Sequence, residues 1–256
     1  AALSLLPVSE IVKSILDRAL LRAVPPRHLP RLALRDGVPP EGKTVCVLSI
    51  LLTGEKAADG ALRRLEEFRA ASRECGENLL FGLLCDLPES GETLSHADRA
   101  LLDDAAAKMD ALNARCGGGF YLFIRDRLFS RDSGKFAPWE RKRGATLELC
   151  RLLAGEETGL RVRAGDASML RGTRYILTLD ADTRLEPESA GELIGAALVG
   201  VAPGIAVKIL ARVPVGAKHA ASVAVAFKIF ARCVESVAAR YACGGGVFFF
   251  VFHYLS

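Results

Sequence analysis

The stretch RYILTLDADTRLEP, Arg174–Pro187, decides how the rest of the sequence is interpreted. Its first half is a short apolar run typical of a buried strand, and two aspartates, Asp180 and Asp182, follow where that strand must stop. Residues two apart in an extended segment point to the same side, so both carboxylates can converge on one ligand. Packing alone does not explain them, because an unpaired buried carboxylate is costly.

Strand-like and helical patterns alternate around this stretch. Continuous apolar runs predict strands, at 43–54, 78–86, 119–126 and 174–180. Amphipathic segments predict helices, at 59–72, 95–118, 143–155 and 187–198. Ser95, with Asp98 three residues on, is the pattern of a capping box. We therefore expect an α/β fold, with a mostly parallel sheet covered by helices on both faces.

An amphipathic helix and a proline-rich linker precede this fold. Ile11 and Ile15 share the apolar face of the helix, Ser9 is its predicted N-cap, and Pro25–Pro26 end it. This helix either packs on its own domain or lies on a membrane surface. The expected boundaries are 1–26 for the helix, 27–42 for the linker, 43–213 for the α/β domain and 214–256 for a diverged or truncated tail.

Composition excludes several classes of protein. The 256 residues carry a formal net charge of +4 at pH 7 with scattered basic residues, so nucleic acid is not an expected partner. The seven cysteines form no C-x-x-C pair, which argues against structural zinc, and thiols in apolar runs favour a reducing compartment. No apolar run reaches the roughly 18 residues of a membrane span. The chain starts without methionine, and we expect it to be a fragment of a longer protein.

Polar residues gather where the predicted strands end. Ligands of parallel sheets bind at the carboxyl ends of the strands, and here those ends carry Thr53, Asp86 and the Asp180–Asp182 pair. Two hard oxygen ligands on a rigid strand end suit Mg²⁺ or Mn²⁺. The sequence therefore predicts a metal-dependent site at this edge.

Two metal-dependent chemistries compete for this pattern. Phosphatases of the haloacid dehalogenase type carry D-x-D-x-[TV] after a strand, but Arg184 stands two residues past Asp182 and three strands precede the motif. Glycosyl transfer from a nucleotide sugar fits better, with a divalent ion bridging the diphosphate to both carboxylates. Asp86 would then hydrogen-bond the nucleoside. The segment WERKRG, 139–144, would bring basic groups to the phosphates beside a helix N-terminus.

The longest motifs resemble one family. WERKRGATLELCRLLAG at 139–155, followed by RYILTLDADTRLEPESAGELIGA at 174–196, is similar to the glycosyltransferase domain of the cyclic β-1,2-glucan synthases. The stretches 6–54 and 78–86 resemble the same family, and the resemblance extends to about Val213.

This resemblance implies a GT-A-type, Rossmann-like domain that binds UDP-glucose and transfers glucose, with inversion, to a growing β-1,2-glucan acceptor. It implies Asp182 as the direct metal ligand and places Asp180 nearer the ribose or a metal-bound water. It makes Asp86 the nucleoside contact and either Lys142 or Arg143 the phosphate contact. It also implies a location at the cytoplasmic face of the bacterial inner membrane, with membrane attachment through flanking segments.

The sequence departs from the family pattern towards its end. The family's H-D-L-x-E-G segment, which holds its expected catalytic base, has no counterpart here, so no residue is identified as the base. The alternative hypothesis is therefore a degenerate, non-catalytic nucleotide-binding or interaction domain.

Overall fold

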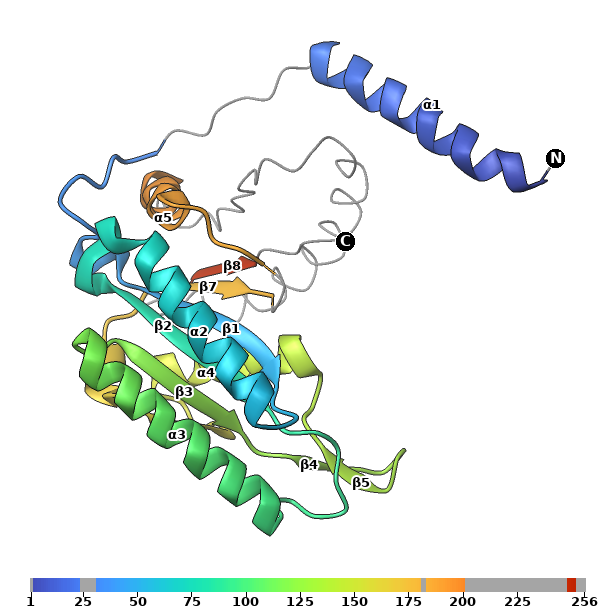
Figure 1. The fold of residues 1–256 in the computed structure, drawn as a ribbon. Helices are drawn as coiled ribbons and strands as arrows, with labels where there is room; N and C mark the ends of the chain where they lie inside the picture. The colour runs from blue at the N-terminus through green and yellow to red at the C-terminus, as the bar shows by residue number, and fades with distance from the viewer. Residues whose placement is uncertain (1, 24–30, 181–182, 201–247, 252–256) are drawn as a thin grey trace. The chain divides into compact units, whose positions relative to one another are not determined.

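The computed structural model describes residues 2–23, 31–180, 183–200 and 248–251. They fall into two units that are described separately. One contains helix α1 (Ala2–Ala23), and the other is the body of the molecule, within residues 31–209 and 245–254 (Figure 1). In the described part of the chain, no helix is both long enough and apolar enough to cross a membrane.

The body is built on a six-stranded sheet. Its strands are β1 (Thr44–Leu51), β2 (Leu79–Asp86), β3 (Phe120–Arg125), β6 (Leu160–Ala164), β7 (Tyr175–Leu179) and β8 (Phe248–Val251). Their order is β6-β3-β2-β1-β7-β8. Neighbouring strands pair in parallel except β3 with β6. The predicted α/β fold with a mostly parallel, Rossmann-like sheet is confirmed.

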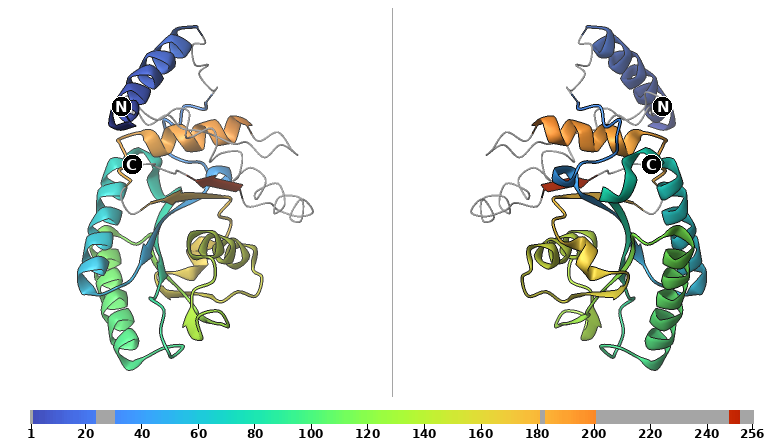
Figure 2. Two further views of the ribbon diagram at one scale, coloured as in Figure 1. Left: turned by 90° about the vertical axis from the view of Figure 1, so that its right-hand side faces the viewer. Right: turned by 90° about the vertical axis from the view of Figure 1, so that its left-hand side faces the viewer.

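Helices cover both faces of the sheet (Figure 2). Helices α2 (Glu55–Ala71) and α3 (His96–Cys116) lie on one face, and α4 (Arg141–Ala154) lies on the other. Helix α5 (Ser189–Gly200) packs against two 3-10 turns, η1 (Pro40–Gly42) and η2 (Arg73–Asn78). Alternate side chains of a strand point to opposite faces of the sheet. Because helices cover both faces, side chains on both sides of the strands are buried. Val45 and Val47 of β1, for example, share one buried cluster with Leu149 of α4.

Several predicted element boundaries were wrong, among them those of α1, β1 and α2. Helix α1 begins at Ala2, so Ser9 lies inside the helix and is not its N-cap. Helix α2 begins at Glu55, before the predicted start at 59, and β1 ends at Leu51. Three residues lie between them, so the β–α connection is one residue shorter than the pattern indicated.

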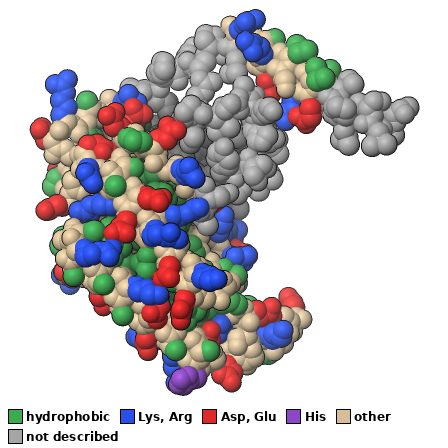
Figure 3. Space-filling view, viewed as in Figure 1, with side chains coloured by type: hydrophobic (Ala, Val, Ile, Leu, Met, Phe, Trp, Pro, Cys, Tyr) green, Lys and Arg blue, Asp and Glu red, His purple; other side chains and the backbone are tan. Residues whose placement is uncertain are grey.

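Exposed ion pairs join the two helices on the outer face. Lys108 of α3 lies 2.7 Å from Asp59 of α2, and Arg115 lies 2.6 Å from Glu66. Figure 3 shows acidic and basic side chains interspersed over these helices. Each such exposed pair contributes at most about 1 kcal/mol, so apolar packing holds the helices in place.

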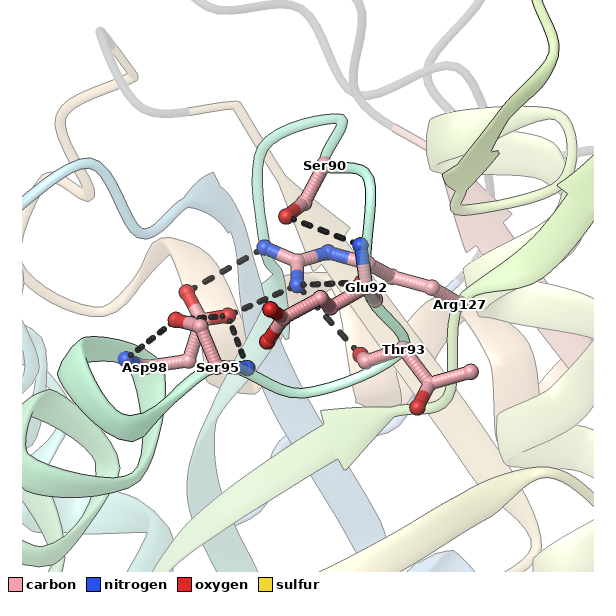
Figure 4. A network of polar contacts seen from close by, with 6 residues as sticks. All are labelled: Ser90, Glu92, Thr93, Ser95, Asp98 and Arg127. Atoms are coloured by element: carbon pink, nitrogen blue, oxygen red, sulfur yellow. Dashed lines mark hydrogen bonds and ion pairs between the residues drawn. The ribbon is translucent and has the colours of Figure 1, made fainter.

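The loop between β2 and α3 is tied down by Arg127 (Figure 4). The Arg127 side chain is 2% exposed, and it donates to Asp98 Oδ2 at 2.7 Å and to the carbonyl oxygens of Glu92 and Thr93. Asp98 also closes the predicted capping box with Ser95, which is confirmed. One carboxylate thus starts α3 and holds the arginine that fixes the preceding loop.

The same loop joins a short hairpin, β4 (Leu128–Ser130) and β5 (Lys135–Ala137). The backbone N–H of Ser90 donates to the carbonyl oxygen of Phe136 at 3.0 Å, and the reverse bond measures 2.8 Å. These two hydrogen bonds join the loop after β2 to the hairpin that follows β3.

Asp98 should make stability depend on pH. The hydrogen bonds from Arg127 and Ser95 lower the pKa of Asp98 from 3.8 to about 2. Because the folded-state pKa is depressed, the stabilisation is complete above about pH 4 and is lost as the pH falls towards 2. We expect Asp98→Asn to lose about 1–2 kcal/mol at pH 7, measured by urea unfolding, and to show a flatter pH dependence between 5 and 2.

The exposed Asp110 on the same helix provides the control. Asp110→Asn should keep the wild-type pH profile. A wild-type profile in Asp98→Asn would contradict the role given to this carboxylate.

Candidate functional site

The central strands bring Asp86 and Asp180 to the same edge of the sheet. Asp86 is the last residue of β2, and Asp180 directly follows β7. Strand β1 lies between them and pairs in parallel with both, with Leu51 opposite Asp86 and Leu48 opposite Leu179. Asp86 is 6% exposed and Asp180 is 9% exposed, so each carboxylate needs a partner.

The partner of Asp86 is Arg125, which the sequence reasoning missed. Arg125 Nε donates to Asp86 Oδ1 and Nη2 donates to Oδ2, both at 2.8 Å. The two side chains are 4% and 8% exposed, and this two-pronged geometry is the strong form of the arginine–carboxylate pair. A signal existed: Arg125 follows five apolar residues at the carboxyl end of a predicted strand.

Arg125 also holds the start of α4. Its Nη1 donates to the carbonyl oxygen of Trp139 at 2.5 Å, and Nη2 donates to that of Arg141 at 3.1 Å. Helix α4 begins at Arg141, so the basic residues lie in its first turn and not ahead of it, as the predicted start at 143 had placed them. These hydrogen bonds hold the start of α4 against the end of β3. Local periodicity in the sequence does not reveal them.

Gly144 makes this junction possible. A Cβ atom at position 144 would overlap the Trp139 carbonyl oxygen and the Nη1 atom of Arg125. The helix can approach the guanidinium this closely only because residue 144 has no side chain.

Lys142 reaches Asp180 from the first turn of α4. Its ammonium nitrogen lies 2.5 Å from Asp180 Oδ1, with side chains 58% and 13% exposed. Arg143 pairs instead with Glu140, at 2.6 Å between Nε and Oε2. Of the two basic residues that the sequence left open, Lys142 is the one in an ion pair with the strand-end aspartate.

Thr53 lies at the same edge on the loop after β1. It is exposed and lines a shallow hollow with five neighbours, namely Gly54, Glu55, Lys56, Ala57 and Leu101. The backbone N–H of Leu52 donates to the Asp86 carbonyl oxygen at 2.8 Å, which keeps this loop beside the end of β2. Asp182 lies outside the described residues.

Of the two aspartates predicted to bind a metal ion, Asp180 lies within the described residues and Asp182 does not. Within the described ranges, no three histidine, cysteine, aspartate or glutamate side chains lie close enough to bind an ion together. Asp180 is a suitable type of ligand for a hard divalent ion, because such ions prefer carboxylate oxygens. In this structure its carboxylate pairs with another cation, the Lys142 ammonium.

The fold and this edge define a Rossmann-like α/β domain whose charged groups gather where its parallel strands end. The sequence is similar to the cyclic β-(1,2)-glucan synthase NdvB of Rhizobium meliloti (strain 1021). The two are 31% identical over 194 residues, which are 74% of this chain and 7% of that protein. No family model matches the chain. The chain is thus related to one small part of a glucan synthase.

Gly144→Ala should disturb the junction between β3 and α4. The added methyl group forces apart Trp139, Arg125 and the helix, so we expect a loss of about 2–3 kcal/mol in the free energy of unfolding, measured with urea. Gly60 in α2 is the matched control because a Cβ there would meet nothing within 4 Å. Gly60→Ala should stabilise the protein by about 0.5–1 kcal/mol. Equal effects at both positions would refute the crowding argument.

Arg125→Met should be strongly destabilising. It leaves the Asp86 carboxylate buried and unpaired, which costs about 3–5 kcal/mol. Arg115→Met removes the same charge from a pair whose side chains are 63% and 43% exposed, so its expected loss is under about 1 kcal/mol. Chemical denaturation of both variants at pH 7 makes the comparison. A loss for Arg125→Met as small as that for Arg115→Met would contradict the structural role of the buried pair.

Proposed function

We propose that the chain is the donor-binding part of an inverting glycosyltransferase that uses UDP-glucose and a divalent ion to extend a β-1,2-glucan. The observation that carries the proposal is the similarity to a glucan synthase over 74% of the chain. The placement of Asp86 and Asp180 at one edge of a Rossmann-like sheet supports it. By its resemblance, the chain would act at the cytoplasmic face of the bacterial inner membrane.

Asp86 and Thr53 would bind the nucleoside. A carboxylate has about four lone-pair positions, so Asp86 can accept a further N–H while both oxygens are held by Arg125. Arg125 keeps the carboxylate in one orientation, because rotation would break two hydrogen bonds. Thr53, on the adjacent loop, offers a hydroxyl at the same edge.

The first turn of α4 would bind the diphosphate. A helix N-terminus presents free backbone N–H groups and a partial positive charge, and Lys142 adds an ammonium there. Asp180 and Asp182 would hold Mg²⁺ or Mn²⁺, which when bound neutralises charge on the departing diphosphate. Inversion also needs a general base near the acceptor hydroxyl, and no residue of this chain is identified as that base.

Calorimetric titration of UDP tests the donor site. We expect binding in the presence of Mn²⁺ and a loss of affinity in EDTA. Asp182→Ala should weaken binding with Mn²⁺ by more than about 10-fold, towards the EDTA level. The exposed Asp110→Ala removes a carboxylate from α3 and should bind UDP as the wild type does. Unchanged UDP affinity in Asp182→Ala would refute the site assignment.

Turnover separates the proposal from its two alternatives. UDP release from UDP-glucose, in the presence of a short β-1,2-glucan, would establish transfer. Metal-dependent UDP binding without turnover would favour a non-catalytic nucleotide-binding domain. Release of inorganic phosphate from phosphate esters would favour the phosphatase.

A further inference from the structure

The two carboxylates of the edge have cation partners of different kinds. Asp86 is held by Arg125, and both side chains are under 10% exposed. Asp180 is held by Lys142, whose side chain is 58% exposed. The Arg125 pair is locked by burial and by additional bonds to backbone carbonyls. The lysine is a compact charge on a flexible stem, in a pair open to solvent on the lysine side.

This difference decides which pair can exchange its partner. Breaking the Asp86–Arg125 pair would leave two buried charges unpaired, which is strongly unfavourable. Moving Lys142 into water returns its ammonium to good solvation, but Asp180 is mostly buried and still needs a cation beside it. A divalent ion can therefore replace Lys142 at Asp180 without any rearrangement of the fold.

We propose that Lys142 competes with a divalent cation for Asp180 and gives up this carboxylate when a nucleoside diphosphate offers its ammonium another anion. The inference rests on the proposed function, because it requires Asp180 to serve as a cation ligand. The physical basis is repulsion between the Lys142 ammonium and the divalent ion. The ammonium lies 2.5 Å from Asp180 Oδ1, where it takes the position of the ion and neutralises the carboxylate. A diphosphate at the first turn of α4 removes the conflict by attracting the ammonium.

The consequence is positive coupling between cation and nucleotide. UDP should tighten Mn²⁺ binding, and Mn²⁺ should tighten UDP binding by the same factor, because coupling free energies are reciprocal. Couplings of this kind are typically about 5- to 150-fold. Without Lys142, the cation should bind more tightly in the absence of nucleotide, and UDP should improve its affinity less.

Lys142→Gln tests the competition, and Arg141→Gln is its matched control. Both remove one positive charge from the first turn of α4. Arg141 takes part in the site through its backbone carbonyl, which accepts from Arg125 and survives the substitution. The control therefore reports the general loss of charge without the contact to Asp180.

The measurement is the Mn²⁺ dissociation constant, from the electron paramagnetic resonance signal of unbound Mn²⁺, without nucleotide and with saturating UDP. We expect Lys142→Gln to bind Mn²⁺ about 5-fold more tightly than wild type without nucleotide, equivalent to a pair worth about 1 kcal/mol. UDP should enhance Mn²⁺ binding less in this variant. Arg141→Gln, and the charge-conserving Lys142→Arg, should stay within about 2-fold of wild type without nucleotide.

The outcomes separate this inference from the proposed function. Nucleotide-free Mn²⁺ affinity that is equal in Lys142→Gln and wild type, or a UDP enhancement of the same size in both, would overturn the competition. An equal gain in Arg141→Gln would overturn it too, because charge alone would then explain the effect. Absence of UDP binding under every condition would reject the nucleotide site, while the nucleotide-free comparison would still decide whether Lys142 competes for Asp180.

Discussion

The buried ion pair between Asp86 and Arg125 is the interaction on which the arrangement of this edge depends. Two charges out of water are tolerated only when hydrogen bonds satisfy them. Here the guanidinium makes four, two to the carboxylate and two to the carbonyls of Trp139 and Arg141. The pair therefore joins the ends of two strands to the start of α4, and the absence of a side chain at Gly144 lets the helix come close enough.

The position of α4 in turn determines what lies opposite the end of β7. With the helix start held at Arg125, Lys142 projects from the first turn and its ammonium meets Asp180. The Asp86–Arg125 pair has a structural role because both of its side chains are buried. The Asp180–Lys142 pair can exchange its cation because the lysine is in contact with water. A rigid contact thus supports an exchangeable one, an arrangement suited to a site where anions and cations meet.

Several elements followed directly from the sequence because their signals are local. The buried parallel strands are continuous apolar runs, and the start of α3 is marked by Ser95 and Asp98. Strand β6 was missed because Arg161 and Arg163 interrupt its apolar pattern, as an edge strand allows. The start of α4 was placed two residues late because no capping side chain marks it: the helix begins after Glu140 in a left-handed conformation, and tertiary bonds hold it there.

The sequence by itself determined the α/β class and the strand ends that carry Asp86 and Asp180, since hydrophobic periodicity is written in neighbouring residues. Only the tertiary structure decided the partners of these carboxylates. Arg125 is 39 residues from Asp86, and Lys142 is 38 residues from Asp180. Those pairings depend on strand order and on how closely a helix packs on the sheet. Both are properties of the whole fold that no local pattern encodes.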